Sequence, residues 1–114
     1  MGPFAIRQIV LLPFPFSDLT ASKLRPALVL ADSGKGDWVL CQITSNPYAD
    51  PAAITLTDAD FAHGSLQRVS YARASKIFTA HESLFQRVAG QLKPERHSQV
   101  VRVIVELLQA GTVT

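Results

Sequence analysis

The stretch that decides the fold is LPFPFSDLTASKLRPALVL, residues 12–30. It contains the end of an apolar strand, a polar loop, and a second apolar run that opens with Arg25 and Pro26. The loop, residues 17–23, places hydroxyl groups and a carboxylate, with cations beside them, next to two rigid strands. Loop residues in such a position more often bind a ligand than pack. This mixture of side chains favours an anionic ligand.

Short apolar segments separated by turn residues continue along the chain, which is typical of a small β-rich domain. Pro13 and Pro15 should end the first strand, and Pro26 should begin the second because it has no amide proton. Residues 32–37 have the composition of a hairpin connection, so the second and third strands should pair antiparallel. Residues 58–66 should form a helical turn or loop ending at Gly64. Strands are expected over residues 8–12, 26–31, 38–44, 53–57, 68–72 and 85–92.

One helix is predicted from Pro94 to about Gln109. Proline suits the first helical turn, Glu95 suits the positive end of the helix dipole, and Gly111 provides a stop. Val103 and Val105 lie off the main apolar stripe, so either a subunit interface or burial within the same domain would account for them. The stripe itself recurs at spacings of three and four and should pack against the sheet: His97, Val100, Val101, Ile104, Leu107 and Leu108.

The composition limits the class of protein. A chain of 114 residues predicts one domain, residues 1–114, and 47% apolar with 18% charged residues indicates a globular protein. The elements predict an α+β, mainly β fold: a small antiparallel barrel or curled sheet closed by a C-terminal helix. No apolar run approaches the roughly 20 residues that span a bilayer. No signal sequence is evident, so we expect no membrane partner and a cytoplasmic location.

Several kinds of site are disfavoured. Cys41 is the only cysteine, and no CxxC, HExxH, P-loop or GxSxG motif occurs, so we expect no metal site and no cofactor. The net charge of +2 conceals an asymmetry: residues 61–104 carry seven arginines and lysines against two glutamates, whereas acidic residues prevail before them. A basic face could gather phosphates, although solvated cations are the commoner explanation of such a pattern.

A family resemblance rests on several separated motifs. PFPFSDLTASKLRPALVL at residues 13–30 is followed by QITS at 42–45, SYAR at 70–73, KIFT at 76–79 and GQL at 90–92. These motifs, in this order, resemble the MazF/PemK family of toxins from bacterial toxin-antitoxin systems. The resemblance implies an SH3-like barrel that forms a homodimer and cleaves single-stranded RNA, in particular mRNA, sequence-selectively and without a metal. It also implies a cognate antitoxin whose disordered acidic tail occupies the RNA groove.

Two residues are the candidate catalytic groups. RNA can be cleaved by its own 2′-hydroxyl, so a protein needs mainly to align the chain and stabilise the added negative charge. The guanidinium of Arg25 has donors that match phosphate oxygens, and we expect it to stabilise that charge. By the resemblance, Thr44 hydrogen-bonds the same phosphate. Without the resemblance, a solvated arginine and a β-branched strand residue would be the better explanations of these positions.

Further residues are candidates for RNA binding. Phe14 and Phe16 could stack on bases, although such aromatic residues more often lie in a core. Some family members have an acidic residue, a candidate general base, at the position of Ser75, and serine is a poor base. Asp18 or one of the histidines at 63, 81 and 97 could substitute, but surface or core roles suit the histidines better. The RNA-binding candidates are Ser17, Asp18, Thr20, Lys23, Ser45, Asn46, Arg73, Ser75 and Lys76.

Two alternatives to an endoribonuclease remain open from the sequence. A catalytically weak toxin of the same fold could inhibit a protein target such as gyrase. A non-toxic RNA-binding or scaffold barrel would use the same basic residues for affinity alone. Growth arrest with intact RNA would indicate the first, and harmless expression the second.

Overall fold

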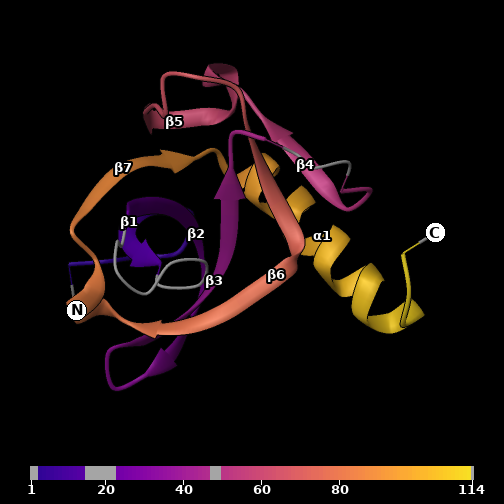
Figure 1. The fold of residues 1–114 in the computed structure, drawn as a ribbon, viewed down its shortest axis with the longest axis horizontal. Coiled ribbons are helices and arrows are strands. Elements are labelled where there is room, and N and C mark those ends of the chain that lie inside the picture. The colour runs from indigo at the N-terminus through magenta and orange to yellow at the C-terminus, as the bar shows by residue number, and fades with distance from the viewer. Residues whose placement is uncertain (1–2, 15–22, 47–49, 114) are drawn as a thin grey trace.

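A curled antiparallel sheet with one long helix forms the structure, a computed structural model that describes residues 3–14, 23–46 and 50–113 (Figure 1). Two short 3-10 helices, Asp58–Asp60 and Glu82–Leu84, interrupt the strands. The helix α1, Pro94–Ala110, follows the last strand. The strands are β1 Gln8–Phe14, β2 Lys23–Gly34, β3 Asp37–Thr44, β4 Ala53–Leu56, β5 Phe61–Gly64, β6 Ser70–His81 and β7 Arg87–Leu92.

The strands form one sheet in the order β4-β6-β3-β2-β1-β7-β5, and all the neighbours pair antiparallel. The predicted α+β, mainly β class is therefore confirmed. The expected closure into a barrel is not found: β4 and β5 are the two edges, and no pairing joins them within the described residues. Each edge strand has only four residues. The 3-10 helix Asp58–Asp60 connects β4 to β5 and changes the direction of the chain, so the two strands do not form a hairpin.

The prolines do not bound the first two strands as expected. Pro13 lies inside β1, and Pro26 lies inside β2, opposite Leu11. The pairing of β2 with β3 begins only at Ala27. At Pro26, β2 therefore pairs with β1 but not with β3. The missing amide proton of the proline thus removes no hydrogen bond between β2 and β3.

The region between β4 and β7 differs most from the prediction. A strand, β5, occupies residues expected to be a loop, and β6 runs to His81 instead of ending at Ala72. The register of β6 explains its length: Ala72 lies opposite Ile43 and Ile77 opposite Cys41, so residues 73–76 form a bulge between two segments that pair with β3. Arg73 still pairs with Ala53 of β4. The first segment also pairs with β4, and the bulge allows the strand to bend between the two pairings.

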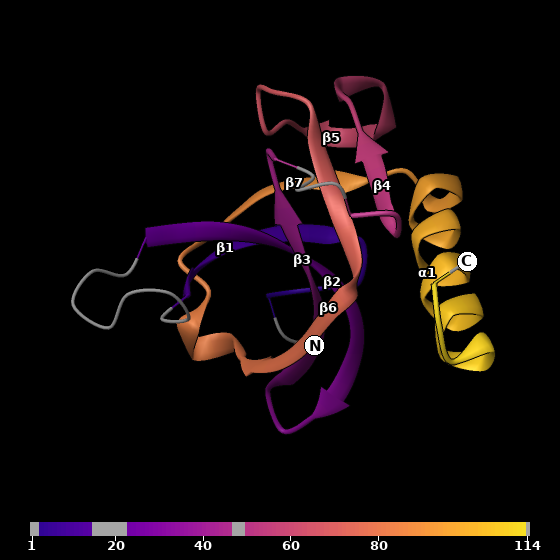
Figure 2. The same ribbon diagram turned by 45° about the vertical axis from the view of Figure 1, so that its right-hand side comes forward.

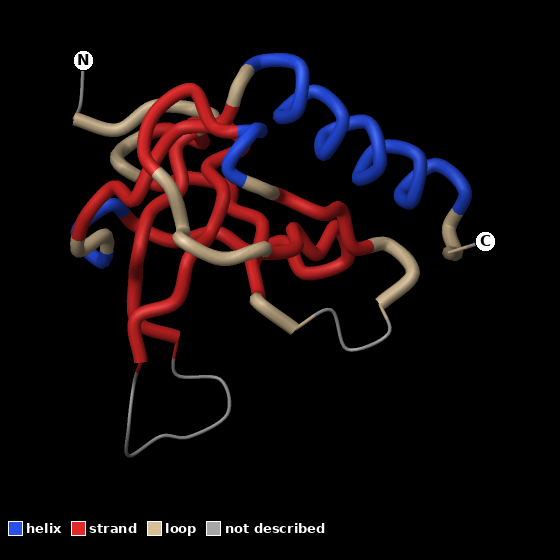
Figure 3. Tube along the Cα trace, turned by 90° about the horizontal axis from the view of Figure 1, so that it is seen from above, coloured by secondary structure: helices blue, strands red, loops and turns tan. Residues whose placement is uncertain are grey.

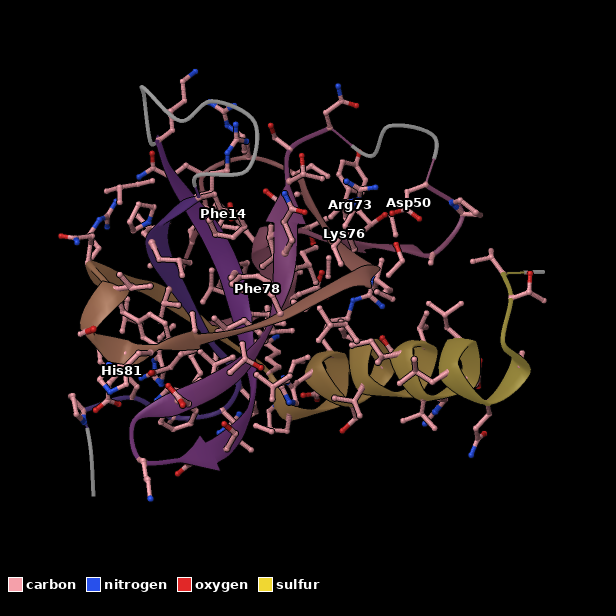
Figure 4. All side chains as sticks on the ribbon, turned by 60° about the horizontal axis from the view of Figure 1, so that its bottom comes forward. Phe14, Asp50, Arg73, Lys76, Phe78 and His81 are labelled. Atoms are coloured by element: carbon pink, nitrogen blue, oxygen red, sulfur yellow. The ribbon has the colours of Figure 1, made fainter. Side chains whose placement is uncertain are left out.

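Both faces of the central strands are buried. Alternate residues of β1, β2 and β3 belong to two separate core clusters, which accounts for the nearly continuous apolar runs in these strands. One cluster includes Ile9, Leu28 and Cys41 and is covered by α1; the other includes Val10 and Phe14. The Phe14 ring meets Phe78 edge-on at 5.1 Å between ring centres, so Phe14 is a core residue rather than an exposed stacking platform (Figure 4).

The helix lies along one side of the curled sheet (Figures 2 and 3). His97, Val100 and Ile104 are buried, as their spacing predicts. Leu108 is 69% exposed and so does not belong to the buried stripe, whereas Val103 packs against the core. Gly111 ends the helix at φ 78°, and its N–H donates to the carbonyl of Leu107. No helix in the described part of the chain is long and apolar enough to cross a membrane.

Candidate functional site

A groove of about 460 Å³ opens where β2 begins, β3 ends and β7 begins. The connection between β5 and β6 forms its remaining wall. Four of the residues predicted from the sequence line this groove together: Arg25, Thr44, Ser45 and Asn46. The other described lining residues are Leu11, Leu24, Pro26, Ile43, Ser65, Leu66, Gln67, Arg68, Ser70, Arg87 and Ala89.

Arg25 and Thr44 come from neighbouring strand ends. The paired register of β2 and β3 ends with Ala27 opposite Gln42. Two residues beyond that pair, on the same face of each strand, stand Arg25 and Thr44. The sheet therefore delivers a guanidinium and a hydroxyl to the same end of the groove, although the two residues are far apart in the sequence.

The Thr44 hydroxyl is oriented by a local hydrogen bond. Its Oγ1 accepts the backbone N–H of Asn46 at 3.1 Å. A hydroxyl has one proton to donate and two acceptor lone pairs, so this bond leaves the Thr44 proton available. Thr44 can thus donate to an anionic oxygen in the groove.

Two further arginines line the groove: Arg68 before β6 and Arg87 at the start of β7. Neither one was predicted from the sequence to have a functional role. Both are exposed, and no ion pair holds either one within the described part of the chain. No aspartate or glutamate is among the described lining residues. The only sequence signal for these two was the basic excess of residues 61–104. The groove thus has three arginines, a concentration of positive charge suited to a polyanion.

The wall that carries Arg68 has a defined conformation. The Ser65 hydroxyl donates to Asp58 at 2.5 Å and accepts the N–H of Gln67 at 2.7 Å. Gln67 has φ 64°, in the left-handed region that non-glycine residues seldom occupy. Gly64, at φ 70°, begins this wall, and a Cβ there would lie 2.3 Å from the carbonyl oxygen of Ala89. The wall is thereby held close against β7.

The family model described as PemK-like, MazF-like toxin of type II toxin-antitoxin system matches residues 6–108. The chain belongs to this toxin family. The match covers the whole groove, including the strand ends that carry Arg25 and Thr44. No curated protein sequence matches the chain.

Solved structures of toxins share the fold of this PemK/MazF family member. A mycobacterial endoribonuclease in complex with its cognate antitoxin matches with a TM-score of 0.73 and 14% identity, covering 95% of this chain and 96% of that one. MazF in a MazE-MazF structure from Deinococcus radiodurans gives 0.73 and 20%, covering 96% and 98%. Toxin MazF-mt6 of Mycobacterium tuberculosis gives 0.70 and 18%, covering 90% and 97%. At these identities the likeness establishes the fold.

Three residues predicted to bind RNA in this PemK/MazF family member lie outside the groove lining. Arg73, Ser75 and Lys76 occupy the bulge of β6. Arg73 donates from Nε to Oδ2 of Asp50 at 2.8 Å, with Lys76 nearby (Figure 4). The hydrogen bond from Arg73 lowers the pKa of the Asp50 carboxyl. Arg73 thus contacts Asp50, on the segment before β4, and is not among the groove lining.

The remaining predicted contacts belong to the N-terminal loop. Lys23 is exposed at the start of β2, opposite Phe14, and is not among the groove lining. Ser17, Asp18, Thr20 and the aromatic Phe16 lie outside the described residues. Among the described residues, the predicted site is thus divided between the groove, the bulge of β6 and Lys23 at the start of β2.

None of the histidines lines the groove of the PemK/MazF fold. His63 is exposed on β5, and His81 accepts the N–H of Ser83 at the end of β6. His97 lies on α1 and is buried, and desolvation and the charge of Arg7 lower its pKa. Among residues 3–14, 23–46 and 50–113, no group of three histidine, cysteine or acidic side chains has the arrangement of a metal site. The polar side chains among the described groove lining are those of arginine, hydroxyl and amide residues.

Proposed function

We propose that this toxin is a metal-independent endoribonuclease that cleaves single-stranded RNA, in particular mRNA, and so inhibits translation and growth. One observation carries the proposal: the strand ends bring Arg25 and Thr44 into a groove whose described lining has three arginines and no carboxylate. A groove of this charge suits a polyanion. The mycobacterial structures named as endoribonucleases have the same fold at low identity and support the proposal.

The reaction needs no covalent intermediate on the protein. The RNA 2′-oxygen forms a bond to the neighbouring phosphorus while the bond from phosphorus to the 5′-oxygen breaks. The products are a 2′,3′-cyclic phosphate and a free 5′-hydroxyl. Charge accumulates on the non-bridging oxygens, where the Arg25 guanidinium and the Thr44 hydroxyl can donate hydrogen bonds. Binding the RNA in an in-line conformation supplies the rest of the rate enhancement.

Two proton transfers accompany this displacement. The 2′-hydroxyl loses a proton, and the departing 5′-oxygen gains one. Ser75 is exposed on β6 and lies outside the groove lining, so it does not replace a carboxylate base. Asp18 stays the candidate base predicted from the sequence, and water is the alternative acceptor.

The same groove is the proposed site of regulation by an antitoxin. Deinococcus radiodurans MazF is found in MazE-MazF structures, and the mycobacterial endoribonuclease is found with its cognate antitoxin. We propose that this toxin also has a cognate antitoxin, whose acidic tail would match the three arginines and exclude RNA. We propose that the active form is a homodimer. We also propose that Ser45 and Asn46 contact RNA bases at the end of the groove.

The test is cleavage of single-stranded RNA by the purified chain in EDTA, followed by analysis of the new ends. We expect 5′-hydroxyl ends and 2′,3′-cyclic phosphates, and Arg25→Ala should reduce cleavage at least a hundredfold, as losing a principal charge-stabilising donor does. Arg102→Ala, which removes an exposed arginine on α1, is the matched control and should cleave normally. Intact RNA across diverse sequences would contradict the proposal. Growth arrest without cleavage would then indicate a protein target.

A further inference from the structure

Arg87 and Arg68 line the same groove as Arg25, on elements that the family motifs around Arg25 and Thr44 do not include. We propose that they form a second phosphate subsite, which binds the RNA phosphate next to the one held by Arg25 and Thr44. The proposal rests on the proposed function, because it assigns the path of the same RNA substrate through the groove. It adds a binding role for two residues to the reaction already described.

The register of the sheet separates the two subsites. Leu11 of β1 lies opposite Pro26 of β2 on one side and opposite Arg87 of β7 on the other. One strand therefore stands between the strands that carry Arg25 and Arg87. Neighbouring strands are about 4.8 Å apart, which places these two backbones about 10 Å from each other. Arg25 lies opposite Leu12 and Arg87 opposite Leu11, neighbouring residues of β1, so the two side chains leave opposite faces of the sheet although both residues line the groove. The two arginines are therefore placed to contact different parts of an RNA backbone rather than one phosphate.

The chemistry of this wall suits a phosphodiester. Arg68 and Arg87 are exposed and have no ion-pair partner within the described part of the chain, so neither must give up a carboxylate in order to bind an anion. Gln67 lines the same wall, and its side-chain amide can donate to phosphate oxygens or to base edges. The hydroxyl protons of Ser65 and Ser70 are already donated, to Asp58 and to the carbonyl of Arg68. Guanidinium groups pair with phosphate oxygens through two parallel hydrogen bonds.

The wall is also ordered before any ligand arrives. Ser65 links the carboxylate of Asp58 to the N–H of Gln67 and so holds Gln67 in its left-handed conformation. Arg68 follows directly in the chain. A strained backbone persists only where its surroundings hold it, and such positions concentrate at ligand clamps. A fixed starting point for the Arg68 side chain lowers the conformational entropy lost on binding.

Binding of an RNA analogue that cannot be cleaved tests the proposal. A 2′-O-methyl oligonucleotide carries the mapped cleavage sequence or, if no RNA is cleaved, the tightest-binding sequence from a random pool. One neutral methylphosphonate replaces each phosphate in turn. We expect the wild-type chain to lose affinity about tenfold at each of two neighbouring linkages. Arg25→Gln should abolish the sensitivity at one linkage, and Arg87→Gln or Arg68→Gln the sensitivity at the other.

The salt dependence of binding provides an independent measurement. Loss of one phosphate contact should reduce the slope of log affinity against log salt by about 0.7. Arg102→Gln removes the same charge outside the groove, so it should leave both the slope and the linkage pattern unchanged. All variants should have wild-type circular dichroism and unfolding midpoints.

Two results would overturn the subsite. In the first, Arg25→Gln and Arg87→Gln abolish sensitivity at the same linkage, which would mean that both arginines hold one phosphate. In the second, the Arg68 and Arg87 variants bind RNA normally and lose affinity only for an acidic peptide, which would assign this wall to a protein partner. Neither result depends on cleavage. The analogue could show the two-linkage pattern while unmodified RNA of the same sequence stays intact. That result would contradict the proposed function and leave the subsite standing.

Discussion

Arg73 binds Asp50 through a hydrogen bond of 2.8 Å between Nε and Oδ2, and this ion pair joins the bulge of β6 to the segment before β4. The Asp50 side chain is only 6% exposed, and its other oxygen accepts the N–H of Ala52. The carbonyl of Arg73 in turn accepts the thiol proton of Cys41. Arg73 therefore has a structural role on β6, and its predicted contact with RNA stays a prediction.

Removing this carboxylate should destabilise the fold without affecting the groove. We expect Asp50→Asn to lower the free energy of unfolding by about 2 kcal/mol at neutral pH, the range for a hydrogen bond to a charged group. The folded-state pKa of Asp50 is lowered, so its stabilisation is present above the ordinary value of 3.8 and is lost as pH falls through the folded value. Urea unfolding at neutral and acidic pH measures both effects. Glu106→Gln on α1 is the control, and an equal loss there would contradict the assignment.

The role of the Thr44 hydroxyl can be separated from its role in the strand. Thr44→Val keeps the β-branched shape but has no proton to donate, and we expect it to reduce kcat about a hundredfold. Thr44→Ser keeps the hydroxyl and should retain activity within about tenfold of wild type. Single-turnover cleavage of a defined RNA measures the difference. Equal activities of the two variants would exclude the hydroxyl as a donor to the phosphate.

Cys41 should be unreactive in the folded protein. The thiol is buried, desolvation raises its pKa to about 12, and the reactive species of cysteine is the thiolate. We expect no labelling by iodoacetamide at pH 8 in buffer and full labelling in denaturant, as followed by mass spectrometry. The rate at intermediate urea should follow the unfolded fraction. Rapid labelling of the folded chain would show that β3 and β6 open at this point.

His97 should make stability depend on pH in a different range from Asp50. Its Nδ1 is buried and has no hydrogen-bond partner within the described part of the chain, and burial lowers its pKa from the ordinary 6.5. Below pH 6.5 the unfolded chain takes up a proton that the folded chain does not, so stability should decline as pH falls from 7 to 5. His97→Phe should flatten this decline, and His63→Gln should not. Unfolding midpoints at both pH values test the expectation, and an unchanged decline in His97→Phe would contradict it.

Local sequence predicted the part of the groove that depends on strand ends. Thr44 closes an apolar run and ends β3, as its neighbours predict. Arg25 precedes a proline at another apolar run, which predicts a place near the start of β2, although the strand begins earlier, at Lys23. Arg68 and Arg87 carried no comparable local signal. Arg68 lies in the connection between β5 and β6, and Arg87 is the first residue of the short strand β7. Only the pairing of β7 with β1 brings Arg87 to the groove.

The sequence by itself determined the mainly β class, the helix from Pro94 and the membership of the toxin family, because these depend on the spacing of apolar residues, turn residues and motifs along the chain. Tertiary structure alone decided that the sheet stays open, that β6 bulges at residues 73–76 and that Arg73 pairs with Asp50. These features depend on the register between strands distant in sequence. Register follows from how whole faces of side chains pack together, which no local pattern contains.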